Sequence, residues 1–166
     1  MPAYEPGPET EPTFEGNALA KAREAVQHTG LPAVADDSGL AVDALNGMPG
    51  VLSARWAGRH GDDAANNALL LAQLEDVPDD RRQAGFVCAA AYALPDGRSD
   101  VVTAHMRGRL LRAPRGTGGF GYDPLLVPDG LEVTSAELAP ADKDAISHRG
   151  QAFRLLAPRL LAALDD

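Results

Sequence analysis

The chain contains a single cysteine, Cys88, among its 166 residues, and only 5% of its residues are aromatic. One cysteine excludes a disulfide framework and fits a reducing compartment, and within the apolar run "FVCAAAYAL" we expect it to be a small buried core residue. No apolar run approaches the roughly 18 residues that a membrane-spanning helix needs. The Pro-rich N-terminus lacks the basic and apolar regions of a secretory signal. These absences predict a cytoplasmic protein that does not enter a membrane.

Basic residues are also few, since 15 Lys and Arg stand against 24 Asp and Glu and give a net charge of -9. A protein that binds DNA or RNA through its phosphates needs a clustered basic face, so a nucleic-acid polymer is excluded as a partner. A mononucleotide is not excluded, because a few local cations and a divalent metal ion can bind a polyanion. The chain has no P-loop, no H-E-x-x-H motif and no G-x-S-x-G elbow.

The remaining composition, 45% hydrophobic and 23% charged, is that of one globular domain spanning residues 1–166. Helical spacing of apolar residues predicts helices over 14–29, from Asp62 or Asp63 to about 75, and over 148–164. Pro158 should kink or split the last of these helices. Extended runs at 83–94 and 99–108 around "PDGR" predict a β-hairpin. Because helices and strands are mixed, we expect an α/β or α+β fold with a mixed sheet.

The stretch "VADDSGLAV", residues 34–42, places two aspartates at the predicted end of a short buried strand. Successive strand residues point to opposite faces, so Asp37 can face a metal ion while Asp36 orients a loop or a water, or the reverse. Ser38 adds a hydroxyl, and Gly39 allows the backbone to approach a ligand closely. A helix cap or a solvated turn would use the same residues, and on this stretch alone that structural interpretation is slightly favoured.

A glycine-rich stretch, "GTGGFGYDP" at residues 116–124, favours a binding site. Its glycines leave backbone N–H groups uncovered, as a phosphate or a planar base requires, and Phe120 and Tyr122 could stack on a nucleobase. A flexible surface loop is the alternative interpretation. Exposed aromatic residues in such a loop are uncommon without a partner, so the interpretation as a site is preferred.

Charged residues at the two ends of the chain complete the candidate set. "KDAISHRGQ", residues 143–151, gathers Lys143, His148 and Arg149, which suit phosphates or the acceptor edge of a base, although they could be only a basic flank of the last helix. Near the N-terminus, Glu9 and the other acids before the first helix could complete a Mg²⁺ site with Asp37. A solvated acidic tail is the alternative for any single glutamate here.

Together these stretches resemble a known family. "TFEGNALAKA", "ADDSGLAVDALNGMPGVLSARWAG", "GTGGFGYDPLL" and "AELAPADKDAISHRGQA" occur in this order, as they do in the inosine/xanthosine triphosphate pyrophosphatases, the Ham1-like family. The resemblance covers nearly the whole chain from Glu9 onward. It implies hydrolysis of noncanonical purine nucleoside triphosphates (dITP, ITP and XTP) to the monophosphate and pyrophosphate, with Mg²⁺ as the cofactor and a homodimer as the assembly. It also implies an elongated α/β fold, a mixed β-sheet flanked by helices, with two lobes and a central cleft.

The resemblance also assigns roles to residues. Asp37 would bind the metal ion and activate the attacking water, with Asp36 and Glu9 as the other expected metal ligands. The positions that match substrate-binding residues of the family are Ser38, Phe120, Gly121, Tyr122, Asp123, Lys143, His148 and Arg149.

The family pattern begins with a strand and a Ser/Thr-x-Asn-x-x-Lys loop that binds the triphosphate, and this sequence does not contain them. The expected single domain is therefore N-terminally shortened, whether the start is misassigned, the chain is cut, or this member has lost the loop. A catalytically weakened purine-nucleotide-binding protein is accordingly the alternative function. An aspartyl-phosphate phosphatase is a weaker third interpretation, because Ser38 replaces the second aspartate of the D-x-D pattern that such chemistry uses.

Overall fold

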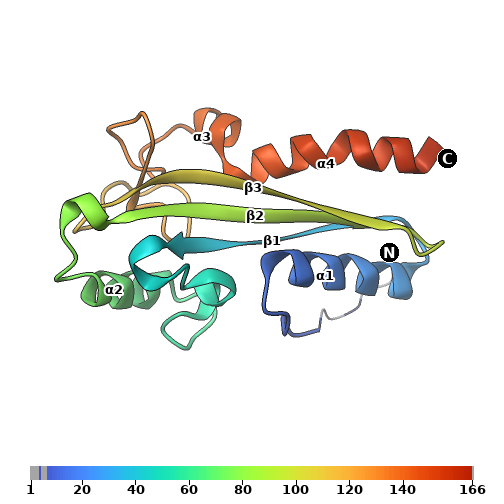
Figure 1. Cartoon of the computed structure of the whole chain (residues 1–166), viewed down its shortest axis with the longest axis horizontal. Helices are drawn as coiled ribbons and strands as arrows, with labels where there is room; N and C mark the ends of the chain where they lie inside the picture. The colour runs from blue at the N-terminus through green and yellow to red at the C-terminus, as the bar shows by residue number, and fades with distance from the viewer. Residues whose placement is uncertain (1–3, 5–6, 166) are drawn as a thin grey trace.

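The computed structural model of the chain describes Tyr4 and residues 7–165. These residues form a four-stranded sheet in the order β1-β2-β3-β4, with every neighbouring pair antiparallel. The strands are β1 (Ala33–Val42), β2 (Gln83–Ala93), β3 (Ser99–Leu110) and β4 (Leu126–Pro128). The expected α/β fold with an elongated sheet flanked by helices is confirmed (Figure 1). We expected a mixed sheet, but in the part of the chain that the structure describes all strand pairs are antiparallel.

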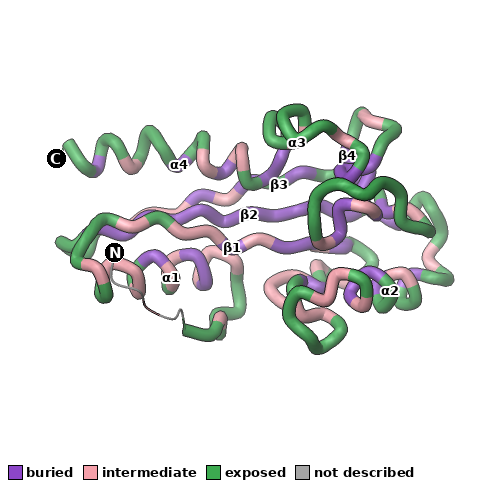
Figure 2. The backbone as a smooth tube through the Cα atoms, turned by 180° about the vertical axis from the view of Figure 1, so that it is seen from behind, coloured by how far each residue is buried: buried purple, intermediate pink, exposed green. Residues whose placement is uncertain are grey.

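Helices cover both faces of the long β2–β3 hairpin. The helices are α1 (Phe14–Thr29), α2 (Asp63–Gln73), α3 (Pro140–Ile146) and α4 (His148–Asp165). Alanines of β2 alternate between the faces: Ala89 and Ala91 pack against α1, whereas Ala90 packs with Cys88 against α4. Small side chains let both helices approach the sheet closely, and Figure 2 shows β2 buried along nearly its whole length. Cys88 is fully buried, as expected.

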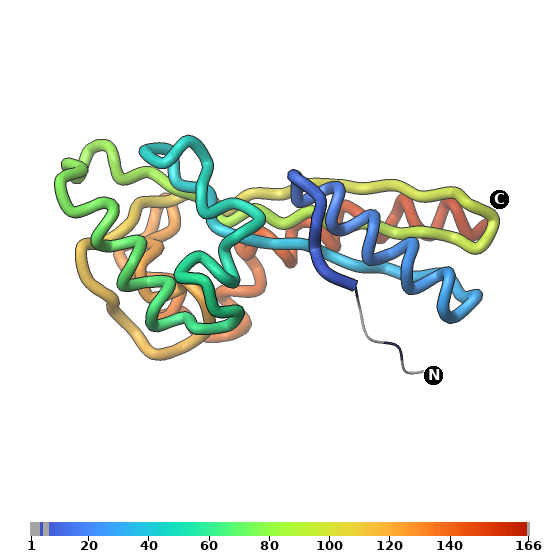
Figure 3. Tube along the Cα trace, turned by 90° about the horizontal axis from the view of Figure 1, so that it is seen from below, coloured from blue at the N-terminus to red at the C-terminus, as the bar shows by residue number. Residues whose placement is uncertain are grey.

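The other end of the sheet carries a second core. Leu40, Phe86 and Met106 of the sheet pack there with Leu70 of α2 and with Tyr122 of the glycine-rich segment. The molecule is elongated: α1 and α4 lie along one end, and α2, α3 and the loops gather at the other (Figures 1 and 3). This arrangement agrees with the expected division into two lobes. None of the helices in the described part is long and apolar enough to cross a membrane.

Local signals predicted most helix and strand boundaries correctly. Thr13 caps α1 by accepting a hydrogen bond from Gly16 N at 3.0 Å, and Gly30 ends this helix in the left-handed conformation. Asp62 caps α2 in the same way. The prediction for Pro158 was wrong, because α4 is one continuous helix that contains it. Pro158 and Arg154 lie on the exposed side, so water can satisfy the carbonyl that the proline leaves without a donor.

The acidic pair lies in the middle of a strand and not at its end. Residues 33–42 form one continuous strand, in which Asp36 is opposite Ala90 and Asp37 is opposite Ala89. The strand continues past Gly39 because a short 3₁₀ helix, η2 (Gly50–Arg55), packs directly on it. A Cβ at residue 39 would lie 2.5 Å from both Gly50 O and Ser53 Oγ. Gly39 is therefore required by close packing within the protein, and this packing needs no ligand to explain it.

Candidate active site

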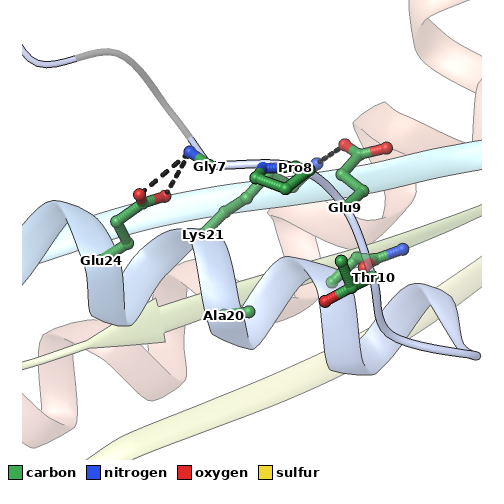
Figure 4. Close-up of a pocket in the computed structure, with 8 residues that line it drawn as sticks. Gly7, Pro8, Glu9, Thr10, Ala20, Lys21 and Glu24 are labelled. Atoms are coloured by element: carbon green, nitrogen blue, oxygen red, sulfur yellow. Dashed lines mark hydrogen bonds and ion pairs between the residues drawn. The ribbon is translucent and has the colours of Figure 1, made fainter.

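Four residues on the α1 side of the sheet form what we call the carboxylate cluster: Glu9, Asn17, Lys21 and Asp37. Asp37 is only 7% exposed. Its Oδ2 accepts a hydrogen bond from Asn17 Nδ2 at 3.0 Å, and its Oδ1 lies 3.3 Å from Lys21 Nζ. Lys21 Nζ also lies 2.7 Å from Glu9 Oε1, as Figure 4 shows. The lysine therefore links two carboxylates that are 28 residues apart in the sequence.

The segment before α1 is held across the helix, and this places Glu9 in the cluster. Glu24, seven residues after Asn17 on the same helix face, accepts a bifurcated hydrogen bond from the single N–H of Gly7, with distances of 2.9 and 3.2 Å to its two carboxylate oxygens (Figure 4). Asn17 Oδ1 accepts a second hydrogen bond of this segment, from Glu11 N at 3.0 Å. The segment and the helix enclose a hollow of about 290 Å³ beside Lys21. The polar face of α1 therefore has a specific function in the fold, because it fixes the backbone that carries Glu9.

Electrostatics within the cluster are asymmetric. Burial raises the pKa of Asp37, and the charge of Glu9 adds to this effect, against the hydrogen bond from Asn17 and the charge of Lys21. Burial lowers the pKa of Lys21, but its hydrogen bond to Glu9 and the charges of both carboxylates outweigh burial and raise it. Both pKa values are raised, which disfavours the charged form of Asp37 and favours that of Lys21, because Lys21 has two anionic partners and Asp37 has one cationic partner. A further cation beside Asp37 would stabilise its ionised form.

The donor set of the cluster fits Mg²⁺. The ammonium of Lys21 already lies between the two carboxylates, so the protein itself places positive charge at this point. Proteins hold Mg²⁺ with one or two carboxylates and leave its other positions to water and substrate phosphates. No set of three or more acidic, histidine or cysteine side chains gathers among the described residues. Glu9 and Asp37 are the two carboxylates of the cluster that could hold such an ion.

Asp36, the third expected metal ligand, is not brought to Glu9 and Asp37. Its side chain lies on the opposite face of β1, as alternation along a strand requires. There its Oδ2 accepts hydrogen bonds from Arg149 Nε and Ser38 Oγ, each at 3.0 Å. The structure thus separates the adjacent aspartates into two environments, one beside α1 and the other beside α4.

The expected substrate-binding residues converge on what we call the aromatic pocket, a cavity of about 120 Å³. It is lined by Ser38, Gly39, Ser53, Ala54, Asp63, Phe86, Phe120, Gly121, Tyr122, Asp123, Lys143 and His148. An adjoining hollow of about 180 Å³ adds Arg149 to Phe120, Lys143 and His148. All eight positions predicted to bind substrate therefore lie in or beside one pocket.

The glycine-rich loop presents Phe120 to solvent and buries Tyr122 and Asp123. The Phe120 side chain is 64% exposed, whereas Tyr122 and Asp123 are 3% and 2% exposed. Tyr122 donates its hydroxyl hydrogen to Ser53 O, and Asp123 accepts hydrogen bonds from Phe120 N and Lys143 Nζ. Tyr122 therefore anchors the loop instead of stacking on a ligand, and of the two aromatic residues in this loop Phe120 is the one that is free to stack.

Two residues of α2 that sequence analysis missed hold this loop from behind. Asp63 Oδ2 accepts a hydrogen bond from Gly121 N at 2.7 Å, and Asn67 Nδ2 donates one to Gly121 O at 2.8 Å. One helical turn thus binds both polar groups of the glycine, whose φ is +59°. The available signal was the pair Asp63 and Asn67, spaced by four in a helix otherwise rich in alanine and leucine. Asn67 is buried, whereas Ala64 and Ala68 of the same helix are exposed.

His148 is the first residue of α4 and is 8% exposed. Its ring stacks on Phe86 with centroids 5.0 Å apart, and its buried Nδ1 has no hydrogen-bond partner in the described part. Burial lowers the pKa of His148 to about 4, and the positive charges of Arg149 and Lys143 act in the same direction. The imidazole is therefore neutral at pH 7 and can donate or accept one hydrogen bond toward the pocket.

His148 is expected to make the protein sensitive to acid. The unfolded chain takes up a proton on this residue near pH 6.5, whereas the folded protein does so only near pH 4. Lowering the pH through this window therefore favours unfolding, by about 2–3 kcal/mol at pH 4.5. Between pH 7 and 4.5, the free energy of unfolding should therefore fall by about 2–3 kcal/mol less in His148→Gln than in the wild type, as measured by urea denaturation. His60→Gln, at an exposed histidine, should behave like the wild type, and equal losses in all three proteins would refute the assignment.

The carboxylate cluster and the aromatic pocket meet at β1 and η2. Along β1, Asp37 belongs to the cluster, and the next two residues line the pocket. Along η2, Ser53 lines the pocket, and Arg55 Nη2 donates a hydrogen bond to Glu9 O at 3.4 Å. Two short segments therefore contribute to both halves, and one ligand could contact both across the edge of β1. Asn17 and Lys21 complete the cluster, although the sequence analysis did not include them among the site residues.

Comparison with known proteins identifies the family. The sequence model of the Ham1 family matches residues 1–159. The chain belongs to the Ham1 family. Among related proteins, the dITP/XTP pyrophosphatase of Nocardia farcinica is 66% identical over 165 residues, which are 99% of this chain and 80% of that protein. That of Mycobacteroides abscessus is 63% identical over 160 residues, 96% of this chain and 78% of that protein.

Solved structures of Ham1 family members share the fold. The nucleoside-triphosphatase, or dITP/XTP pyrophosphatase, of Mycobacterium abscessus has a TM-score of 0.83 at 63% identity, over 96% of this chain and 82% of that one. The Staphylococcus aureus Ham1 protein has a TM-score of 0.87 at 40% identity, over 94% of this chain and 80% of that one. The resemblance stated from sequence motifs is therefore confirmed at the level of family and fold.

Proposed function

We propose that the chain hydrolyses the noncanonical purine nucleoside triphosphates dITP, ITP and XTP to the monophosphate and pyrophosphate, and so removes them from the nucleotide pool. The observation that carries this proposal is the position of Asp37. Its buried carboxylate lies in a cluster that fits a metal ion, and the next residue, Ser38, lines the aromatic pocket. The names of the close relatives, dITP/XTP pyrophosphatases, support the same substrates.

Hydrolysis between the α and β phosphates requires mainly positioning of the substrate and neutralisation of its charge. Lys21 would bring its positive charge to the phosphates, and Glu9 and Asp37 would hold Mg²⁺. When bound, the ion would offset phosphate charge and lower the pKa of a bound water. Asp37 would act as general base and accept the proton of the attacking water.

Selection of the base would occur in the aromatic pocket. Phe120 can stack on any purine, because every base has a π-face. Hypoxanthine and xanthine carry an oxygen acceptor at position 6, where adenine carries an amino donor. An N–H donor aimed at this position can therefore bond to the first two bases but leaves the amino group of adenine unpaired. Lys143 is bonded to Asp123 and Arg149 to Asp36, but both keep further N–H donors, and neutral His148 can supply one more. We assign the discrimination mainly to Arg149.

The test is pyrophosphate release from dITP, ITP, XTP and ATP in the presence and absence of Mg²⁺. We expect turnover of the first three only with the metal ion, and turnover of ATP at least about tenfold slower in kcat/KM. Binding of ITP without any turnover would instead support the alternative, a catalytically weakened purine-nucleotide-binding protein. Equal turnover of ATP and ITP would refute the proposed specificity.

Three finer expectations accompany this function. Mg²⁺ dependence is supported by the fit of Glu9 and Asp37 to that ion. A cytoplasmic location would give the enzyme access to the nucleotide pool, and the single buried thiol fits a reducing compartment. The homodimer remains a prediction from the family resemblance, which size-exclusion chromatography with light scattering would test.

A further inference from the structure

Asp36 is the centre of a hydrogen-bond network that joins three elements on the α4 side of the sheet. Its Oδ2 accepts from Arg149 Nε of α4 at 3.0 Å and from Ser38 Oγ of β1 at 3.0 Å. The thiol of Cys88 on β2, which is fully buried, lies 3.6 Å from the same oxygen. The Asp36 side chain is only 21% exposed. One carboxylate oxygen therefore fixes the start of α4 to the strand that also carries Asp37.

This network determines how Arg149 is held. Its bond through Nε is the only hydrogen bond that the guanidinium makes within the described residues, so both terminal nitrogens remain available to a ligand. The side chain is 48% exposed, and Cζ lies 6.0 Å from the centroid of Phe120. An arginine side chain carries about 2 kcal/mol of rotamer entropy, part of which is lost on binding. Anchoring Nε in advance lowers that loss and keeps the remaining donors beside the exposed ring.

We propose that Asp36 is a positioning residue for base recognition, which holds Arg149 beside Phe120, and that it is not a ligand of the metal ion. The proposal rests on the proposed function, since it concerns recognition of the same purine. Two adjacent aspartates would then have separate tasks. Asp37 would serve the phosphates on one face of β1, and Asp36 would serve the base through Arg149 on the other.

The structure supplies a matched control for this ion pair. Asp100 of β3 bonds to Arg159 of α4 with the same 3.0 Å separation of oxygen and nitrogen. Neither residue lines the aromatic pocket or its adjoining hollow. Asp100→Asn therefore removes an equivalent link between the sheet and α4 without touching the site. A merely structural role for Asp36 would make both substitutions act alike.

The experiment is a double-mutant cycle of Asp36→Asn and Arg149→Met, read as the ratio of kcat/KM for dITP to that for dATP. We expect Asp36→Asn to lower this ratio about tenfold, mainly through a higher KM for dITP, with an unchanged Mg²⁺ concentration for half-maximal rate. Arg149→Met should lower it at least as much, and the double variant should be no worse than Arg149→Met alone. Asp100→Asn should leave the ratio at its wild-type value.

Several outcomes would overturn the proposal. A higher Mg²⁺ requirement in Asp36→Asn with an unchanged substrate ratio would make Asp36 a metal ligand, and independent effects in the double variant would show that the two residues are not coupled. Should Asp36→Asn not fold, Asp36→Glu runs the same cycle, with a smaller loss expected because the charge is kept. Dissociation constants for IMP and AMP without metal give a second readout.

The failure of this inference can be told apart from the failure of the proposed function. If the wild type hydrolyses dITP and Asp36→Asn keeps the full preference for dITP over dATP, only this inference is refuted. If the wild type neither binds nor hydrolyses ITP, the proposed function is refuted and this inference with it.

Discussion

Replacing Asp37 by asparagine is expected to slow pyrophosphate release from dITP by at least about a hundredfold, because the substitution removes the general base. It also removes one of the two carboxylates that fit a metal ion, and the full effect should exceed that of losing a base alone. The amide keeps the shape of the side chain beside Asn17 and Lys21. The measurement is the initial rate of pyrophosphate release at saturating dITP and Mg²⁺.

The variant should remain folded, since burial already disfavours the charged form of Asp37, as its raised pKa indicates. A thermal unfolding midpoint close to that of the wild type would establish this. Asp43→Asn is the matched control, because Asp43 directly follows the same strand and pairs with Arg107 away from the site. It should retain wild-type turnover. An Asp37→Asn protein with more than a tenth of wild-type activity would exclude Asp37 as the general base.

Gly39→Ala should lower the free energy of unfolding by about 3 kcal/mol, because the new methyl group would overlap packed atoms. Its Cβ would lie 2.5 Å from Gly50 O, which is backbone, and 2.5 Å from Ser53 Oγ. Ser53 Oγ cannot turn aside without loss, since it accepts a hydrogen bond from Leu40 N at 2.8 Å and donates one to Gly50 O at 2.6 Å. The strain should therefore displace η2 from β1.

Urea denaturation of Gly39→Ala and Gly30→Ala separates this overlap from backbone strain. Gly30 has a φ of +68°, and no neighbouring side chain or backbone lies within 4 Å of the point that a methyl group would occupy, so its substitution should cost only about 1 kcal/mol of conformational strain. Because η2 carries Ser53 and Arg55 into the two halves of the site, Gly39→Ala should also lower turnover at temperatures where it is still folded. Equal destabilisation by the two substitutions would show that the contact with η2 does not constrain residue 39.

Sequence motifs were sufficient to predict the family and to select residues that the structure brings together around one pocket. Residues far apart in the chain, such as Ser38, Phe120 and Lys143, were expected to act together, and the structure places them around one cavity. Physical signals in the sequence alone were weaker, because aspartate, serine and glycine also form ordinary turns. The mid-strand position of the acidic pair was missed for this reason, since "DDSG" has turn composition although η2 packing keeps it extended.

By itself the sequence determined the elements whose ends are set locally. Thr13, Gly30 and Asp62 act through hydrogen bonds to residues a few positions away, and "PDGR" turns the chain between β2 and β3. Only the tertiary structure decided the partners of the charged groups. The Asp36–Arg149 bond joins residues 113 positions apart, and the Asp63–Gly121 bond joins residues 58 apart. Such contacts depend on how helices pack against the two faces of the sheet, and strand alternation then directs neighbouring aspartates to different partners.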